Sequence, residues 1–196
     1  MESSAHTKVI ILDKALNLFS RKGYASVGIQ EIVTEAGITK PTLYYYFKSK
    51  QGLLEAIIAE HGAELLRITR KAAEYRHDIG MNLTAILRET ISFAHRDTSF
   101  YRLGMSLFSA APETAGYAPG HRLRRELVAL LERLFIAAAE DHAPLRNREK
   151  VYAETFRGLI ETWAALSIDG AVQREIQIDA YLQYRIIHQY LYGIFS

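Results

Sequence analysis

The sequence contains no cysteine and only four prolines among its 196 residues. Without cysteine the chain has neither a disulfide framework nor thiolate chemistry, and this composition fits a reducing compartment. No segment approaches the roughly 18 consecutive apolar residues of a membrane-spanning helix, and the N-terminus lacks an apolar run of the signal-peptide type. Apolar residues make up 49% of the chain, enough to bury a core. We therefore expect a folded cytoplasmic protein.

Positive charge is concentrated in the first fifty residues. The whole chain has 24 Lys/Arg and 22 Asp/Glu, a net charge of +2. Residues 1–50 hold seven of these cations and four of these anions, a balance of +3, which leaves −1 for residues 51–196. A basic segment attached to a neutral remainder indicates a polyanionic partner, although a solvated helix surface would have the same composition.

Strand-like alternation is missing, and so are internal repeats and low-complexity tracts. Apolar residues instead recur every three or four positions, as in amphipathic helices. The pattern predicts an all-α fold of about nine helices, with an N-terminal three-helix head (residues 1–50) and a larger helical body (residues 51–196) that a long fourth helix joins to it. The expected helices cover about residues 8–22, 29–36, 40–47, 50–75, 81–95, 98–110, 120–142, 147–168 and 177–195.

The stretch GITKPTLYYYF, residues 37–47, has the signals of a tight turn followed by a short helix. Gly37 can adopt the positive φ of such a turn, Thr39 can cap the helix with its hydroxyl, and Pro41 fits the first helical turn. Leu43 and Phe47 are four residues apart and so share one inward stripe. Together with the preceding apolar helix, this pattern predicts a helix-turn-helix.

The remaining side chains of this short helix must point outward, because successive residues on a helix lie about 100° apart. Phenolic hydroxyls can donate hydrogen bonds to phosphate oxygens, and tyrosine rings can pack against sugars or thymine methyl groups. We therefore predict a DNA-contacting surface formed by Lys40, Thr42, Tyr44, Tyr45 and Tyr46.

Two segments, KALNLFSRKGY and IQEIVTEAGITKPTLYYYFKSKQGLL, resemble the DNA-binding head of the tetracycline-repressor (TetR) family of bacterial regulators. The resemblance covers about residues 8–56 and includes the order Ala-Gly-x-Thr-Lys-x-Thr-Leu-Tyr-x-x-Phe-x-x-Lys. It implies an effector-binding body that dimerises through a bundle of the last two helices. It places Thr39, Lys40, Pro41, Thr42 and Tyr45 at the DNA major groove, and Tyr44, Tyr46 and Lys50 at phosphates.

Two positions depart from the family pattern. The second helix of the family usually starts with a Thr or Ser that caps it and touches phosphate, but here Val27 and Gly28 supply no hydroxyl. Ser26 is the only nearby substitute. Gly52 stands in the first turn of the fourth helix, where the family often has an acidic residue, and we expect that turn to fray.

The body carries large aromatic side chains that either line an effector pocket or form plain core. A run of rings at helical spacing is more often core than a ligand site. Arg102, Arg157 and Glu161 lie among these rings and could orient a ligand or pair with one another. The candidate ligand-binding residues are Phe93, Phe100, Tyr101, Phe108, Tyr152, Phe156 and Trp163.

The last two helices are apolar on more than one face, which predicts burial on more than one side. In the ninth helix, one side carries Ile178, Tyr181, Leu182 and Ile186, and another carries Tyr184, Ile187, Leu191 and Phe195. A second copy of the chain is the natural partner for the additional face. We therefore predict a homodimer with its interface within about residues 147–195.

Motifs of catalysis and metal binding are incomplete. The triplet His95-Arg96-Asp97 matches the start of a kinase catalytic loop, but Arg102 stands where that loop has its metal-binding Asn. The seven histidines show no recurring metal-ligand spacing. We predict neither an enzyme nor a metal site or cofactor.

Taken together, the residues and the resemblance predict a homodimeric regulator of transcription. We expect a repressor that binds a palindromic double-stranded DNA operator and is released by a small-molecule effector, apolar or aromatic. Two alternatives stay open: an activator or a regulator without an effector, and an enzyme or lipid carrier built on the helical body.

Overall fold

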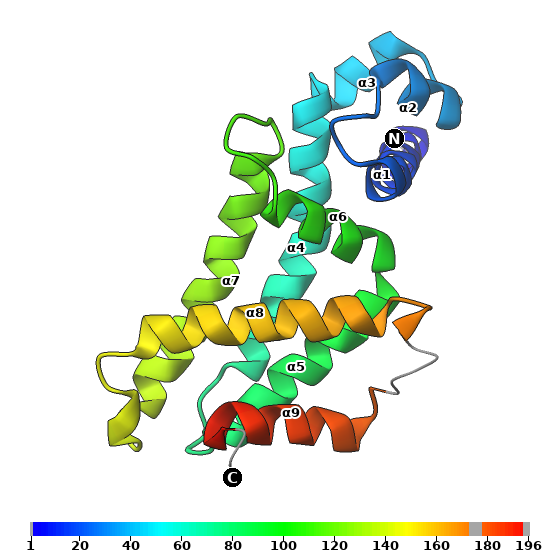
Figure 1. The fold of residues 1–196 in the computed structure, drawn as a ribbon. Coiled ribbons are helices and arrows are strands. Elements are labelled where there is room, and N and C mark those ends of the chain that lie inside the picture. Colours follow the sequence, from blue (N-terminus) through cyan, green and yellow to red (C-terminus); the bar gives the residue numbers. More distant parts are fainter. Residues whose placement is uncertain (1, 173–177, 194–196) are drawn as a thin grey trace. The chain divides into compact units, whose positions relative to one another are not determined.

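The computed structural model describes residues 2–172 and 178–193, and within these ranges the chain forms nine α-helices, one short 3-10 helix and no strand (Figure 1). The predicted all-α class is therefore confirmed. The helices are α1 (Glu2–Lys22), α2 (Ile29–Glu35), α3 (Lys40–Phe47), α4 (Lys50–Ala72), α5 (Ile79–Arg96), α6 (Thr98–Phe108), α7 (Tyr117–Ala138), η1 (Ala143–Leu145), α8 (Glu149–Ser167) and α9 (Ala180–Tyr192).

The chain divides into two compact units that both draw on separate stretches of sequence. Unit 1 comprises Met1–Ala63 and Ser99–Arg124, and unit 2 comprises Glu64–Thr98 and Arg125–Ser196. Both α4 and α7 contribute residues to each unit. The boundary expected after residue 50, between a DNA-binding and an effector-binding domain, stays a prediction.

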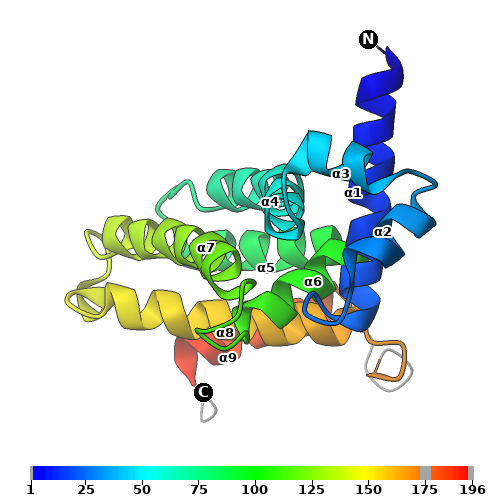
Figure 2. The same cartoon turned by 90° about the horizontal axis from the view of Figure 1, so that it is seen from above.

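Unit 1 contains the N-terminal head, in which α2 packs against both α1 and α3 (Figure 2). Ile11, Ala15 and Phe19 recur at helical spacing on α1 and are fully buried, so they form the apolar face against which the head closes. Gly23 ends α1 with a φ of +81°, and its N–H donates to the carbonyl of Phe19 at 3.0 Å. A residue with a side chain would be strained in this left-handed conformation.

Helix α6 also belongs to unit 1 and contacts both α1 and the first part of α4. The Ser99 hydroxyl donates to Oδ1 of Asn17 at 3.1 Å, and the Phe100 ring stacks on His61 with centroids 5.2 Å apart. Phe100 is 1% exposed. These contacts connect α6 with α1 and with α4 inside one compact unit.

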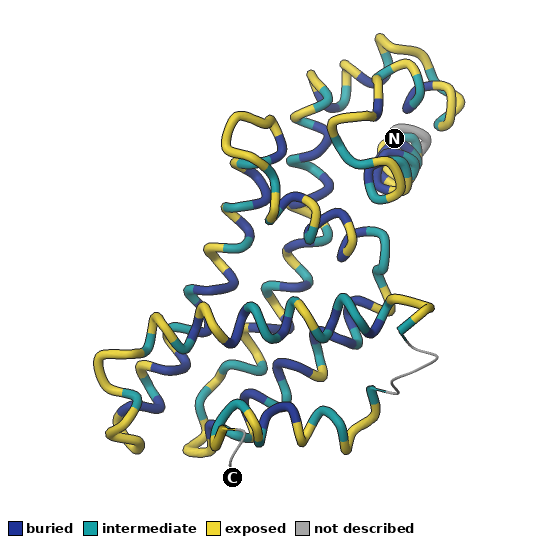
Figure 3. Tube along the Cα trace, in the orientation of Figure 1, coloured by how far each residue is buried: buried dark blue, intermediate teal, exposed yellow. Residues whose placement is uncertain are grey.

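Unit 2 is built around α5, which packs against both α8 and α9. Buried positions recur along α5 and α8 at helical spacing (Figure 3). Asp78 caps α5 by accepting a hydrogen bond from the backbone N–H of Met81 at 2.9 Å. The Asn82 amide then donates to the carbonyls of Ala72 and Glu74, which satisfies backbone acceptors at the end of α4.

The helix limits lie within about four residues of the sequence-based predictions except at the start of α1. Helix α3 occupies the predicted residues 40–47, whereas α1 begins about two turns earlier than residue 8. Helix α9 runs only from Ala180 to Tyr192, and Phe195 lies outside the described residues. Among the helices of the described ranges, none is long and apolar enough to cross a membrane.

Candidate DNA-binding site

Local capping fixes the turn between α2 and α3. Gly37 adopts a φ of +64°, and the N–H of the next residue, Ile38, returns to the carbonyl of Val33 at 3.0 Å. Thr39 is the N-cap of α3, and its Oγ1 accepts from the backbone N–H of Thr42 at 3.4 Å. The capping role predicted for Thr39 is therefore confirmed.

The inner face of α3 anchors the helix in the head. Leu43 is fully buried and Phe47 is 5% exposed, as their four-residue spacing predicted. They share the core of unit 1 with Ile32, Val33 and Leu53. Because this face is fixed by burial, the orientation of the opposite face follows from the helix period alone.

The outer face of α3 presents polar and aromatic side chains to solvent. Tyr44 and Tyr45 are 44% and 71% exposed, and Lys40 and Pro41 are also exposed. Thr42 is half-buried, and its hydroxyl lies 2.9 Å from that of Thr39, so that one of these groups donates to the other. The arrangement offers two phenolic hydroxyls and one ammonium group to an external acceptor.

Tyr46 differs from its two neighbours because it is half-buried. Its ring meets the Tyr45 ring edge to face, with centroids 5.1 Å apart. The Phe47 ring is tilted against it, with centroids 6.1 Å apart. Edge-to-face pairs are favourable arrangements of aromatic rings. Tyr46 therefore supports the exposed Tyr45 ring, while its predicted phosphate contact stays a prediction.

Lys50, predicted to hold a phosphate, is turned toward the chain itself. Its ammonium donates to the carbonyl of Ala25 at 3.4 Å and lies 4.3 Å from the ring centroid of Tyr24. Burial lowers the pKa of this ammonium. An ammonium group has three donors, so a phosphate can be bound beside Ala25. The contact to DNA stays a prediction.

Lys48 was not among the predicted DNA-contacting residues. It is exposed at the C-terminal end of α3 with a φ of +63°, and its ammonium donates to the carbonyl of Tyr45 at 3.3 Å. This places a cation beside the most exposed tyrosine of the outer face. The concentration of lysine in residues 1–50 was the sequence signal that could have identified it.

The two departures from the family pattern have different structural consequences. Gly28 is the N-cap of α2 without a side-chain hydrogen bond, and a Cβ added there would meet no atom within 4 Å. A Cβ at Gly52, in contrast, would lie 2.2 Å from the carbonyl oxygen of Phe47. Ser49 caps the first turn of α4 by accepting from the N–H of Gly52 at 2.9 Å. That turn thus has a side-chain cap, and its expected fraying stays a prediction.

Comparison with protein families identifies this head. The model of the family described as "Bacterial regulatory proteins, tetR family" matches residues 11–57, which extend from α1 into α4. Residues 11–57 therefore form a DNA-binding head of the TetR family.

One curated relative is the HTH-type transcriptional activator FasR of Mycolicibacterium smegmatis, 33% identical over 93 residues. That match spans 47% of this chain and 42% of FasR, and further curated relatives match over shorter stretches of their length. The names of these relatives describe regulators of transcription.

Solved structures share the fold over nearly the whole chain. The regulator FadR of Bacillus subtilis, in complex with stearoyl-CoA, has a TM-score of 0.75 at 15% identity and covers 95% of this chain and 98% of that one. The fatty acid degradation regulator FadR of Bacillus halodurans has a TM-score of 0.72 at 17% identity, covering 96% of both chains. At these identities the likeness establishes the fold.

The seven aromatic residues predicted to line an effector site are distributed over both units. Phe100, Tyr101 and Phe108 belong to unit 1, and Phe93, Tyr152, Phe156 and Trp163 belong to unit 2. In unit 2, Phe156 lies 6.5 Å from Phe135 and 5.2 Å from Tyr190, measured between ring centroids. These are contacts of a packed core. Plain core was the alternative to an effector pocket that the sequence left open for these rings. Trp163 is half-buried.

The last two helices show one buried face and several exposed apolar side chains. In α9, Ile186 and Ile187 are 5% and 3% exposed, whereas Tyr181 and Tyr184 are 68% and 58% exposed. Burial of Ile187 follows from the packing of α9 against α5. The face available for a second chain in α9 therefore includes Tyr181 rather than Ile187.

Proposed function

We propose that this TetR-family protein is a homodimer that binds a palindromic operator through two helix-turn-helix heads. The outer face of α3, with Tyr45 71% exposed beside Lys40, is the observation that carries this proposal. The exposed phenol ring and the adjoining ammonium and hydroxyl groups match the phosphate, sugar and base groups that DNA presents. Half-sites should be about one helical turn apart, near 34–36 Å.

The test is selection of DNA from a random-sequence pool, followed by binding measurements at several salt concentrations. A symmetric sequence should be enriched. In the variants Lys40→Ala and Thr42→Ala, discrimination at one base pair of each half-site should fall by about 1–3 kcal/mol. Selection of no preferred sequence, or a preference unaffected by both variants, would contradict readout by α3.

Dimerisation is tested with the exposed apolar residues of the last two helices. Val151 on α8 is 66% exposed, and Tyr181 on α9 is 68% exposed. Introducing Asp at both positions should produce monomers that no longer bind the palindrome, because two linked heads are needed for tight binding. Ile136→Asp is the control, since Ile136 is also exposed, at 53%, but lies on α7. A dimer that survives the double substitution would place the interface elsewhere.

We further propose that a largely apolar effector releases the operator, so that the protein is a repressor. The stearoyl-CoA bound to FadR of Bacillus subtilis makes a long-chain acyl thioester the first compound to test. The name of FasR favours the alternative of an activator. The sign of regulation is decided by transcription from the selected operator, with and without the protein.

Effector binding should be visible through Trp163, the single tryptophan of the chain. Stearoyl-CoA should change its fluorescence over the same concentrations at which it releases DNA. By linkage, operator DNA must weaken the binding of the effector by the same factor. If DNA is released without this reciprocity, stearoyl-CoA acts through its own aggregation or its negative charge and not as an effector.

A further inference from the structure

Lys48 lies between α3 and α4 in a backbone conformation that lysine rarely adopts. It is the C-cap of α3 with a φ of +63°, and its N–H donates to the carbonyl of Tyr44 at 3.0 Å. A side chain is strained at such a φ, and glycine is the usual residue there. The other positive φ angles that the structure describes in unit 1 belong to Gly23 and Gly37. A strained lysine at this position therefore suggests a function for its side chain.

The side chain of Lys48 lies along the end of α3. Its ammonium donates to the carbonyl of Tyr45 at 3.3 Å and is 6.0 Å from the centroid of the Tyr45 ring. Lys14, in the same unit, pairs with Glu35 at 3.6 Å, whereas no carboxylate among the described residues forms an ion pair with Lys48. An ammonium has three donors, so two N–H groups of Lys48 remain for an external acceptor.

Without this cation, the C-terminal end of α3 would repel a phosphate. The last carbonyl groups of a helix carry partial negative charge, and the last turn of α3 itself contains no basic residue. A DNA backbone that approached this end would meet those carbonyls. The ammonium of Lys48, bonded to the Tyr45 carbonyl, supplies the positive charge that such an approach requires.

Lys48 is too far from Lys40 to contact the same base pair. The two residues are eight positions apart, which corresponds to about 12 Å along the helix axis, whereas one base step of DNA measures about 3.4 Å. A lysine ammonium is a point charge that suits a phosphate oxygen, and it lacks the fork of donors with which arginine binds two acceptors. A phosphate is therefore the acceptor that Lys48 fits.

We propose that Lys48 contacts a DNA phosphate beside the Tyr45 ring, and that a strained residue is kept at this position for that contact. The ammonium then donates both to the Tyr45 carbonyl and to a phosphate oxygen, so the same contact holds the exposed Tyr45 ring against the DNA. This inference rests on the proposed binding of DNA through α3.

The test compares substitutions of Lys48 in the full chain. Binding is measured between roughly 50 and 200 mM salt, on the selected operator duplex and on a scrambled duplex of the same length. Lys48→Asn removes the charge but tolerates a positive φ. It should weaken binding to both duplexes alike and lower the magnitude of the slope of log K against log salt by about 0.9 for each bound head. Lys48→Arg keeps the charge and should keep the slope.

Lys48→Gly separates the DNA contact from a structural role. Glycine relieves the strain of the positive φ, so Tm should equal or exceed that of the unmodified chain. Binding of DNA should nevertheless weaken as much as in Lys48→Asn. A lower Tm for Lys48→Gly would show that the side chain serves the fold, and it would overturn the proposal. A reduced slope in Lys48→Arg would overturn it as well.

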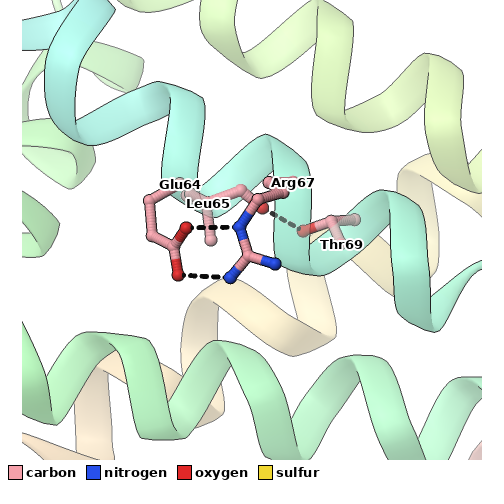
Figure 4. Close-up of polar contacts among 4 residues, drawn as sticks. All are labelled: Glu64, Leu65, Arg67 and Thr69. Carbon is pink, nitrogen blue, oxygen red and sulfur yellow. Dashed lines mark hydrogen bonds and ion pairs between the residues drawn. The ribbon is translucent and has the colours of Figure 1, made fainter.

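Arg67→Gln is the control for a general effect of charge. Arg67 is an exposed cation of α4 in unit 2, and its Nε and Nη2 donate to the carboxylate oxygens of Glu64 at 2.6 and 2.8 Å (Figure 4). Because this charge is already paired, its loss should leave the affinity for both duplexes within about twofold. An equal fall of the slope in Arg67→Gln and Lys48→Asn would overturn the proposal.

Failure of this inference differs from failure of the proposed function. If the unmodified chain selects an operator but Lys48→Asn leaves the slope unchanged, Lys48 contacts no phosphate and operator binding stands. If the selection enriches no sequence, two duplexes of unrelated sequence take its place. A slope that Lys48→Asn lowers on both of them supports the phosphate contact while operator recognition fails. Binding to no duplex would overturn both.

Discussion

Replacement of Gly52 by alanine should destabilise the junction between α3 and α4. A Cβ at this position would lie 2.2 Å from the carbonyl oxygen of Phe47. That oxygen also accepts the N–H of Ser49 at 2.7 Å, and the Ser49 hydroxyl accepts the N–H of Gly52 at 2.9 Å. Because backbone rather than a flexible side chain occupies the space, the junction must open and both hydrogen bonds weaken.

The size of the effect follows from these contacts. Loss of a helix cap costs about 1 kcal/mol, loss of a backbone hydrogen bond costs about 1 kcal/mol, and forced overpacking adds about 1 kcal/mol or more. Alanine is favoured over glycine in a helix by about 1 kcal/mol, which offsets part of the cost. We expect a net loss of about 2 kcal/mol, which for a chain of this size lowers Tm by roughly 4–8 °C.

The measurement is thermal unfolding at a fixed protein concentration, because the proposed dimer would make Tm depend on concentration. Gly104→Ala is the control in the same unit. Gly104 lies within α6, and its added Cβ would approach only the ring of Phe108, at an ordinary 3.8 Å. This control should gain about 0.5–1 kcal/mol from helix propensity. A rise in Tm for Gly52→Ala similar to that of Gly104→Ala would refute the described geometry of the junction.

The remaining predictions concern DNA affinity and pH dependence. Lys50→Ala should weaken binding to all DNA sequences alike and lower the magnitude of the slope of log K against log salt by about 0.9. An unchanged slope would show that Lys50 contacts the Ala25 carbonyl but no phosphate. Gly28→Ser should stabilise α2 by a few tenths of a kcal/mol and tighten DNA binding at low salt; weaker binding would exclude a phosphate near this N-cap. His77 and then Tyr75 lower the pKa of Asp141, so its contribution to stability is present above the ordinary aspartate pKa of about 3.9 and is lost as pH falls through the lowered pKa. Acid titration of Asp141→Asn should lack this loss, and an identical acid transition in both proteins would contradict it.

The outer face of α3 was predictable because it depends on local signals. The limits of α3 follow from Thr39 as cap and Pro41 in the first turn, and its buried face follows from the four-residue spacing of Leu43 and Phe47. The end of α9 had a comparable local signal that was missed. Gly193 adopts a φ of +85° immediately after Tyr192, and glycine is the usual residue after a helix C-terminus.

Features that join distant parts of the chain could not be predicted in the same way. The ammonium of Lys50 meets the carbonyl of Ala25, 25 residues earlier, so spacing on one helix gives no indication of the contact. A groove in unit 2 is lined by residues near Arg67 together with residues near His188. Only the packing of α9 against α5 brings these segments together.

The two apolar faces of α9 illustrate how far a periodic pattern can be interpreted. Such a pattern predicts that a helix has contacts on two sides, because each apolar stripe must be removed from water. It does not distinguish a partner in the same chain from a partner in another copy. Within the chain, α5 covers the side that carries Ile187, which leaves Tyr181 exposed. A charged residue at Ile187 would therefore unfold unit 2 before it tested dimerisation, whereas a charge at Tyr181 acts on the exposed side alone.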